Sequence, residues 1–102
     1  MEIIVDSDHL TVELDGQAVR VRGEIDLAAR PAIEEALRRA RTDGPAVFDL
    51  DEVTFIDSAG LSCLLEATKR EGGAKLGSLS PAIRRFLELT NTDEMFGFQL
   101  DA

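Results

Sequence analysis

The chain has 102 residues, a length that fits one domain with a single modest core. Its hydrophobic content of 44% and its charged content of 30% are ordinary for a globular protein in water. The formal net charge of −9 argues against nucleic acid and anionic membranes as partners, because both would repel this surface. The charge favours a basic or neutral protein partner.

The cysteine content and the start of the chain exclude further classes of protein. Cys63 is the only cysteine, which excludes an intramolecular disulfide and a four-thiolate metal site. The first residues lack the basic segment and the long apolar core of a secretion signal. No apolar run approaches the roughly 20 residues that a membrane helix needs. We therefore expect a cytoplasmic protein with no membrane segment.

The first third of the chain predicts strands followed by a helix. Residues 3–5 are β-prone, and apolar residues alternate with polar ones over 10–14. The pair Asp15-Gly16 is typical of a hairpin turn, and 18–23 then forms the returning strand. A helix is predicted over 27–41 from an apolar stripe at helical spacing. The stripe consists of Ile33, Ala36, Leu37 and Ala40.

The rest of the chain alternates strands and helices. An apolar strand over 46–50 precedes a helix over 58–71, and a weaker strand is predicted over 74–79. Ser80-Pro81 begins a third helix, because serine caps a helix well and proline is tolerated in its first turn. Alternation of Phe96, Phe98 and Leu100 predicts a final edge strand.

This order predicts a single α/β domain over residues 1–102. The mixed β-sheet is opened by an N-terminal hairpin, and the helices pack mainly on one of its faces.

The junction between the central strand and the second helix contains the main candidate functional residues. Asp57 and Ser58 are both good helix N-caps, and leucines then recur at helical spacing. A helix N-terminus offers unpaired N–H groups and a partial positive charge, so an added phosphate can be accommodated there. On local pattern alone, a capping role for Ser58 is favoured over a phosphate-accepting one.

Four segments together resemble the STAS domain family, in particular the stand-alone anti-sigma factor antagonists of bacteria. They are Gly23-Glu24-Ile25-Asp26, residues 48–61 with the core Asp57-Ser58-Ala59-Gly60-Leu61, Gly72-Gly73-Ala74, and residues 80–90. Two features depart from the common pattern. Many family members carry glycine where this chain has Ser62, and residues 74–79 are less apolar than usual.

The resemblance implies partner switching. An antagonist of this family binds an anti-sigma factor, usually a GHKL-type serine kinase, and thereby releases a sigma factor. The kinase phosphorylates the motif serine, which is Ser58 here, and binding is switched off. A PP2C-type phosphatase acts on the phosphorylated form. The antagonist is expected to be a monomer or a weak dimer, and catalysis belongs to the kinase.

Several residues are expected around Ser58. Asp26 is a candidate cap of the first helix, Asp57 of the second and Ser80 of the third. Gly60 either lets a partner approach or lets the second helix pack closely, and the sequence leaves both open. The predicted partner interface consists of Asp26, Asp57, Ser58, Ala59, Gly60 and Ser62.

Two other classes of function compete. A STAS-type accessory or regulatory subunit of a lipid or anion transport complex is the alternative that the family resemblance leaves open. An enzyme is not expected, because the sequence has no phosphate-cradling Gly-x-x-x-x-Gly-Lys loop and no serine-histidine-acid set. Asp49, Asp51 and Glu52 are interpreted as solvated surface. We expect no cofactor and no metal.

Overall fold

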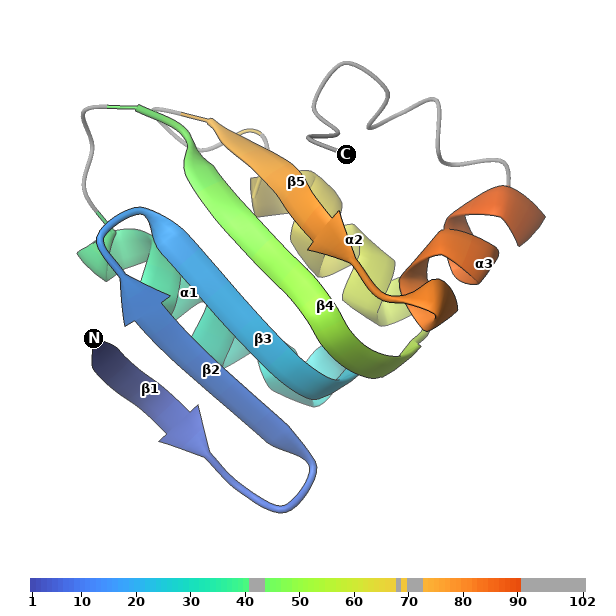
Figure 1. Cartoon of the computed structure of the whole chain (residues 1–102), viewed down its shortest axis with the longest axis horizontal. Helices are drawn as coiled ribbons and strands as arrows, with labels where there is room; N and C mark the ends of the chain where they lie inside the picture. The colour runs from blue at the N-terminus through green and yellow to red at the C-terminus, as the bar shows by residue number, and fades with distance from the viewer. Residues whose placement is uncertain (41–43, 68, 70–72, 91–102) are drawn as a thin grey trace.

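The computed structural model describes residues 1–40, 44–67, 69 and 73–90, which form a five-stranded sheet with helices (Figure 1). The elements are β1 (Glu2–Asp6), β2 (Leu10–Asp15), β3 (Ala18–Ile25), the 3-10 turn η1 (Leu27–Ala29), α1 (Arg30–Arg39), β4 (Ala46–Ile56), α2 (Ser58–Ala67), β5 (Ala74–Leu79) and α3 (Pro81–Leu89).

The sheet is mixed, with its strands in the order β1-β2-β3-β4-β5. β2 runs antiparallel to both of its neighbours, β1 and β3, whereas β3, β4 and β5 are mutually parallel. The predicted hairpin joins β2 to β3, but its turn lies at Gly16-Gln17, one residue later than expected, because Asp15 still pairs with Ala18. Gly16 has a positive φ of 65°, a conformation that glycine adopts without a steric penalty.

The helices cover one face of the sheet, as predicted. α1 lies behind β1–β3 and α2 behind β4, while α3 packs against β4 and β5 at the carboxyl end of β5 (Figure 1). Alternate strand residues such as Val19, Val21 and Phe48 are fully buried against Ile33 of α1 and Leu64 of α2. Burial of each such side chain contributes about 1.5–3 kcal/mol, so this single core holds the layers together.

β4 is longer than the predicted strand 46–50 and continues to Ile56. Two register shifts against β3 each insert one extra residue into β4. As a result, Leu50, Val53 and Ile56 are all buried although they are spaced by three. Such bulges keep a strand in its sheet but interrupt the two-residue alternation of buried and exposed side chains. The strand predicted from that alternation is therefore shorter than β4.

Two helices of the structure differ at their ends from the predicted ones. The first begins as η1 and becomes α-helical at Arg30, and its predicted last residue, 41, lies outside the described residues. The second is α-helical to Ala67, Lys69 lies in a turn, and 68 and 70–71 lie outside the described residues. The predicted strand 96–100 also lies outside them. β5 and α3 are present where they were predicted.

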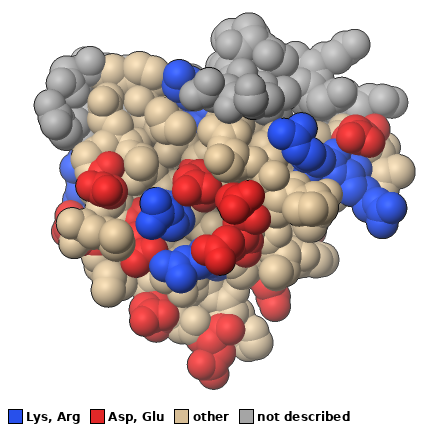
Figure 2. Space-filling view, in the orientation of Figure 1, with Lys and Arg blue, Asp and Glu red and all other residues tan. Residues whose placement is uncertain are grey.

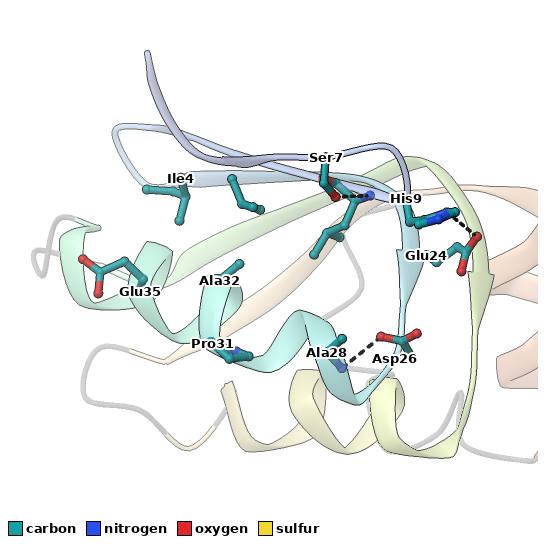
Figure 3. Close-up of a pocket in the computed structure, with 11 residues that line it drawn as sticks. Ile4, Ser7, His9, Glu24, Asp26, Ala28, Pro31, Ala32 and Glu35 are labelled. Carbon is teal, nitrogen blue, oxygen red and sulfur yellow. Dashed lines mark hydrogen bonds and ion pairs between the residues drawn. The ribbon is translucent and has the colours of Figure 1, made fainter.

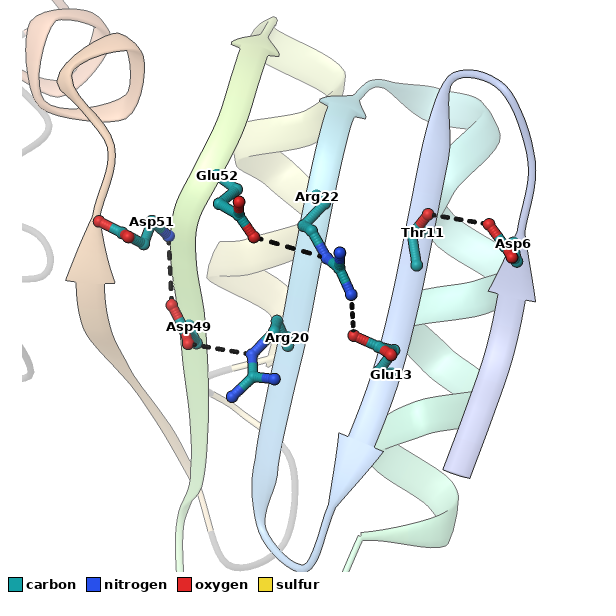
Figure 4. A network of polar contacts seen from close by, with 8 residues as sticks. All are labelled: Asp6, Thr11, Glu13, Arg20, Arg22, Asp49, Asp51 and Glu52. Atoms are coloured by element: carbon teal, nitrogen blue, oxygen red, sulfur yellow. Dashed lines mark hydrogen bonds and ion pairs between the residues drawn. The ribbon is translucent and has the colours of Figure 1, made fainter. Parts of the chain in front are cut away.

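The other face of the sheet carries a network of charged side chains (Figures 2 and 4). Arg22 of β3 forms ion pairs with Glu13 of β2 and, at 3.6 Å, with Glu52 of β4. Arg20 pairs with Asp49 at 3.3 Å. These cross-strand pairs explain why so many carboxylates are tolerated side by side on this face.

Candidate functional site

The parallel strands β3 and β4 end side by side, and both segments that follow carry predicted site residues. Ile25 and Ile56 are register partners. The N–H of Asp57 lies 3.4 Å from the Ile25 carbonyl oxygen, so Asp26 and Asp57 leave the sheet as neighbours. We call this region, residues 25–27 and 55–58, the β3–β4 end.

Asp57 occupies the N-cap position of α2. Its Oδ1 accepts a hydrogen bond from the Gly60 N–H at 2.8 Å, and its carbonyl accepts one from the Leu61 N–H at 2.9 Å. Ser58 is the first residue of the helix. Of the two residues that suit a cap by type, Asp57 makes the capping contact, so capping does not account for Ser58.

The Ser58 side chain is exposed to solvent. Within the described part of the chain, no hydrogen bond engages its hydroxyl. The backbone N–H groups in the first turn of a helix lack intrahelical partners and carry partial positive charge. An accessible hydroxyl therefore stands at a place where a phosphate would be electrostatically tolerated.

Gly60 is buried against the end of β3. A Cβ atom built on Gly60 would lie 2.1 Å from the Ile25 carbonyl oxygen and 2.8 Å from the Ile25 carbonyl carbon. Of the two roles left open by the sequence, the geometry supports close packing of α2. Gly60 is buried, and its contact with a partner stays a prediction.

The other predicted interface residues remain at the surface to different degrees. Ser62 is exposed and follows Ser58 by one helical turn, so both lie on one face of α2. Asp26, Asp57 and Ala59 are half-buried. Asp26 caps η1, because its Oδ1 accepts a hydrogen bond from the Ala28 N–H at 3.0 Å.

Ser80 has a structural role away from this region. Its hydroxyl oxygen accepts a hydrogen bond from the Ile83 N–H at 3.2 Å, which caps α3, and its own N–H donates to the Leu50 carbonyl at 3.1 Å. The side chain is buried. Ser80 therefore fixes α3 to the sheet and contributes nothing to the surface around Ser58.

Sequence reasoning missed two exposed apolar side chains at the β3–β4 end. Leu27 is 62% exposed and Phe55 is 48% exposed. The sequence pattern places Leu27 in a helix and Phe55 in a connection and predicts a role for neither. The spacing of three between Val53 and Ile56 was the available signal, since it leaves Thr54 and Phe55 together on the outside.

A cavity of about 570 Å³ lies between the β1–β2 strands and α1 (Figure 3). Its apolar lining includes Ile4, Leu10 and Ala32, while Glu24 and Asp26 stand near its β3–β4 end. Among the described residues that line it, three are carboxylates and none is lysine or arginine. Phosphate groups would be repelled there, so the cavity gives no support to nucleotide binding.

Cys63 belongs to the core. It is buried on α2, and this burial raises the pKa of its thiol, while the nearby Arg30 guanidinium opposes the shift. Arg30 itself pairs with Glu66 of α2 and, at 3.9 Å, with Glu34. A buried neutral thiol is a poor nucleophile, so Cys63 is a packing residue.

Within the described ranges, no three His, Cys, Asp or Glu side chains converge as metal ligands. Asp49 faces Arg20 and accepts a hydrogen bond from the Asp51 N–H at 3.2 Å.

Among the described helices, none has both the length and the apolar character needed to cross a bilayer.

Comparison with known proteins defines the class. The model of the STAS domain matches residues 9–101, and the chain belongs to this family. An anti-sigma-F factor antagonist, RsfB of Mycobacterium tuberculosis, is 35% identical over 98 residues, covering 87% of this chain and 80% of RsfB. A STAS-domain containing protein of Pseudomonas aeruginosa is 32% identical over 89 residues, covering 80% of this chain and 88% of that protein.

Solved structures agree with this assignment. An anti-sigma factor antagonist from Mycobacterium paratuberculosis superimposes with a TM-score of 0.63 at 33% identity, over 96% of this chain and 80% of that one. The anti-sigma factor antagonist SpoIIAA in its unphosphorylated form gives a TM-score of 0.61 at 22% identity, over 89% of this chain and 84% of that one. At that identity, the SpoIIAA match supports the shared fold alone.

Proposed function

We propose that this protein is an anti-sigma factor antagonist that binds an anti-sigma factor with serine kinase activity and releases a sigma factor. The single observation that carries the proposal is the exposed, unengaged Ser58 hydroxyl on the first residue of α2. Two relatives of the same family, from Mycobacterium tuberculosis and Listeria monocytogenes, are named anti-sigma factor antagonists, which supports this assignment.

Phosphorylation of Ser58 switches binding off. It adds about −1.5 to −2 charges at neutral pH. The added charge lies beside Asp57 at the start of α2 and near Asp26, which leaves the sheet next to it. The helix N-terminus stabilises the phosphate, so the fold remains intact. The binding surface becomes strongly anionic, and a partner docked over Ser58 is excluded by size and by charge.

The chemistry of phosphate transfer belongs to the partners. Asp57 uses Oδ1 to cap α2 and serves as an orienting residue for the turn that carries Ser58. The kinase supplies ATP, metal ion and base, and a PP2C-type phosphatase removes the phosphate. The protein acts in the cytoplasm as a monomer or weak dimer and has no enzymatic activity of its own.

Calorimetric titration against the purified anti-sigma factor tests the switch. Wild type is expected to bind, and Ser58→Asp to bind at least about tenfold more weakly, as expected for a central interface residue. Ser78→Asp is the matched control, because Ser78 is an exposed serine on β5 outside the β3–β4 end. Equal affinities of wild type and Ser58→Asp would refute charge-controlled binding.

Amide NMR spectra of the phosphorylated and unmodified protein test the claim that the fold is unchanged. We expect shifts confined to the start of α2 and the adjoining residues of η1 and β4. Shifts spread through core residues such as Phe48 and Ile33 would show instead that phosphorylation acts by changing the fold.

A further inference from the structure

Exposed apolar side chains are few in the described part of the chain. The large ones are Met1, Ile3, Leu27, Phe55 and Leu89. Two of these, Leu27 and Phe55, belong to the β3–β4 end, where Ser58 also lies. Exposed apolar side chains that gather in one region, bordered by polar residues, are typical of a protein interaction surface.

The backbone places Leu27 and Phe55 on either side of this end of the sheet. Leu27 begins η1, which packs against α2 on the helix-covered face. Phe55 pairs in register with Glu24 and lies on the opposite face from its buried neighbour Ile56. Ser58 begins α2 two residues after Ile56, so a partner that meets both apolar side chains has to extend across the end of the sheet where Ser58 lies.

The fold itself gives no reason for apolar residues at these two positions. Neither side chain is part of the buried core or packed against it. The cap of η1 is made by the Asp26 carboxylate and the Ala28 N–H and does not involve the Leu27 side chain.

The charge around the two side chains determines what kind of partner fits. Glu24 is the register partner of Phe55 and Asp26 directly precedes Leu27, and the whole chain carries a net charge of −9. In Figure 2 the basic side chains over the middle strands stand among acidic ones, with which Arg20 and Arg22 form ion pairs. A partner for this region needs apolar recesses bordered by lysine or arginine.

We propose that Leu27 and Phe55 are the two apolar anchors through which this protein binds its anti-sigma factor. The inference rests on the proposed function and names the residues that supply the binding energy. The docking face of the anti-sigma factor offers two apolar recesses with a basic border. A phosphate on Ser58 would add a bulky anionic group at this end of the sheet and oppose the contact by size and by charge.

The experiment uses the anti-sigma factor that wild-type protein retains, after its identification by mass spectrometry and its purification. Calorimetric titrations compare Leu27→Ala, Phe55→Ala and the control Ile3→Ala. Ile3 is a matched control, because it is 61% exposed but lies on the edge strand β1. Thermal unfolding of each variant verifies that the fold is retained.

Each anchor variant is expected to bind at least about tenfold more weakly than wild type, as interface anchors do, while Ile3→Ala binds like wild type. Wild-type affinity of both anchor variants, with binding still abolished by Ser58→Asp, would overturn the anchors and leave the proposed function standing. Weakening by only one anchor variant, or equal weakening by Ile3→Ala, would also overturn the assignment. If wild type binds no anti-sigma factor, the proposed function and the inference fail together.

Discussion

Gly60 shows how strongly one residue determines the position of Ser58. The residue has no side chain, so α2 approaches the Ile25 carbonyl closely enough for Asp57 and Asp26 to lie side by side. The helix propensity of alanine would favour it over glycine here by about 1 kcal/mol, yet the contact leaves no space for a Cβ atom. The steric effect therefore dominates at this position.

We predict that Gly60→Ala lowers the free energy of unfolding by about 1–3 kcal/mol, the usual cost of overpacking. The Cβ atom would meet backbone, and backbone cannot move aside as the end of a flexible side chain can. Urea denaturation measures the change. Ser62→Ala is the control on the exposed face of the same helix, and an unchanged midpoint for Gly60→Ala would contradict the packing role.

Cys63 has a consequence for stability at alkaline pH. Burial raises its pKa, so the folded protein holds the thiol neutral while the unfolded chain ionises near its ordinary pKa of about 8.5. The stabilisation by the neutral thiol is fully present below that pH and is lost as the pH rises through the folded pKa. The chain has no tyrosine, which simplifies the comparison in this range.

We expect the free energy of unfolding of wild type to fall more steeply above about pH 8.5 than that of Cys63→Ala. Denaturant titrations at neutral and alkaline pH give the two slopes. The variant also loses some packing at every pH, so the slopes are compared and not the absolute values. Parallel pH profiles would show that the folded thiol ionises like an exposed one.

At the scale of elements, the cap of α2 separates the roles of Asp57 and Ser58. Asp57 binds the Gly60 N–H through its side chain, which frees Ser58 from any structural duty that the described contacts reveal. The phosphorylation proposed for Ser58 would therefore leave the capping contact of α2 in place.

We predict that Asp57→Ala destabilises the protein by about 0.5–2 kcal/mol through loss of the cap, while Asp57→Asn retains most of the stability. Asparagine keeps the side-chain oxygen that accepts the Gly60 N–H and removes only the charge. Urea denaturation distinguishes the two variants. An equally large loss for both would mean that the charge of Asp57, and not its hydrogen bond, stabilises α2.

The elements also show what the sequence could and could not predict. The hairpin, β5 and α3 followed from turn residues, β-propensity and the Ser80-Pro81 cap, all of which are local signals. The extension of β4 through Val53 to Ile56 depends on bulges that the alternation rule does not contain. The packing role of Gly60 depends on the Ile25 carbonyl, which is distant along the chain, so only the fold reveals it.

The candidate site was predictable to a similar degree. Asp57 and Ser58 were recognised by type and position, and resemblance to the STAS family favoured modification over capping for Ser58. The local pattern did not decide which of the two makes the cap contact. Leu27 and Phe55 were missed because their exposure depends on how η1 and the β4 bulges turn the chain, and no periodicity in the sequence records that.

For the whole molecule, the net charge of −9 governs how a partner is reached. Long-range attraction speeds association with a basic surface and is screened by salt, whereas apolar anchors act only at contact. We expect the association rate with the anti-sigma factor to fall as salt is raised, with a smaller change in the dissociation rate. Stopped-flow measurements over a salt series test this, and a salt-independent association rate would contradict electrostatic steering.

The strand register determines which end of the sheet the N-terminus occupies, and this matters when the protein is tagged or immobilised. Glu2 pairs with Leu14, Leu14 with Val19 and Val19 with Phe48, so the N-terminus lies at the far end of the sheet from Ile25 and Ile56. Figure 1 shows the same separation between the N-terminus and the start of α2. A tag or a surface tether attached at Met1 is therefore distant from Ser58, and immobilised protein keeps the region around Ser58 accessible to its partners.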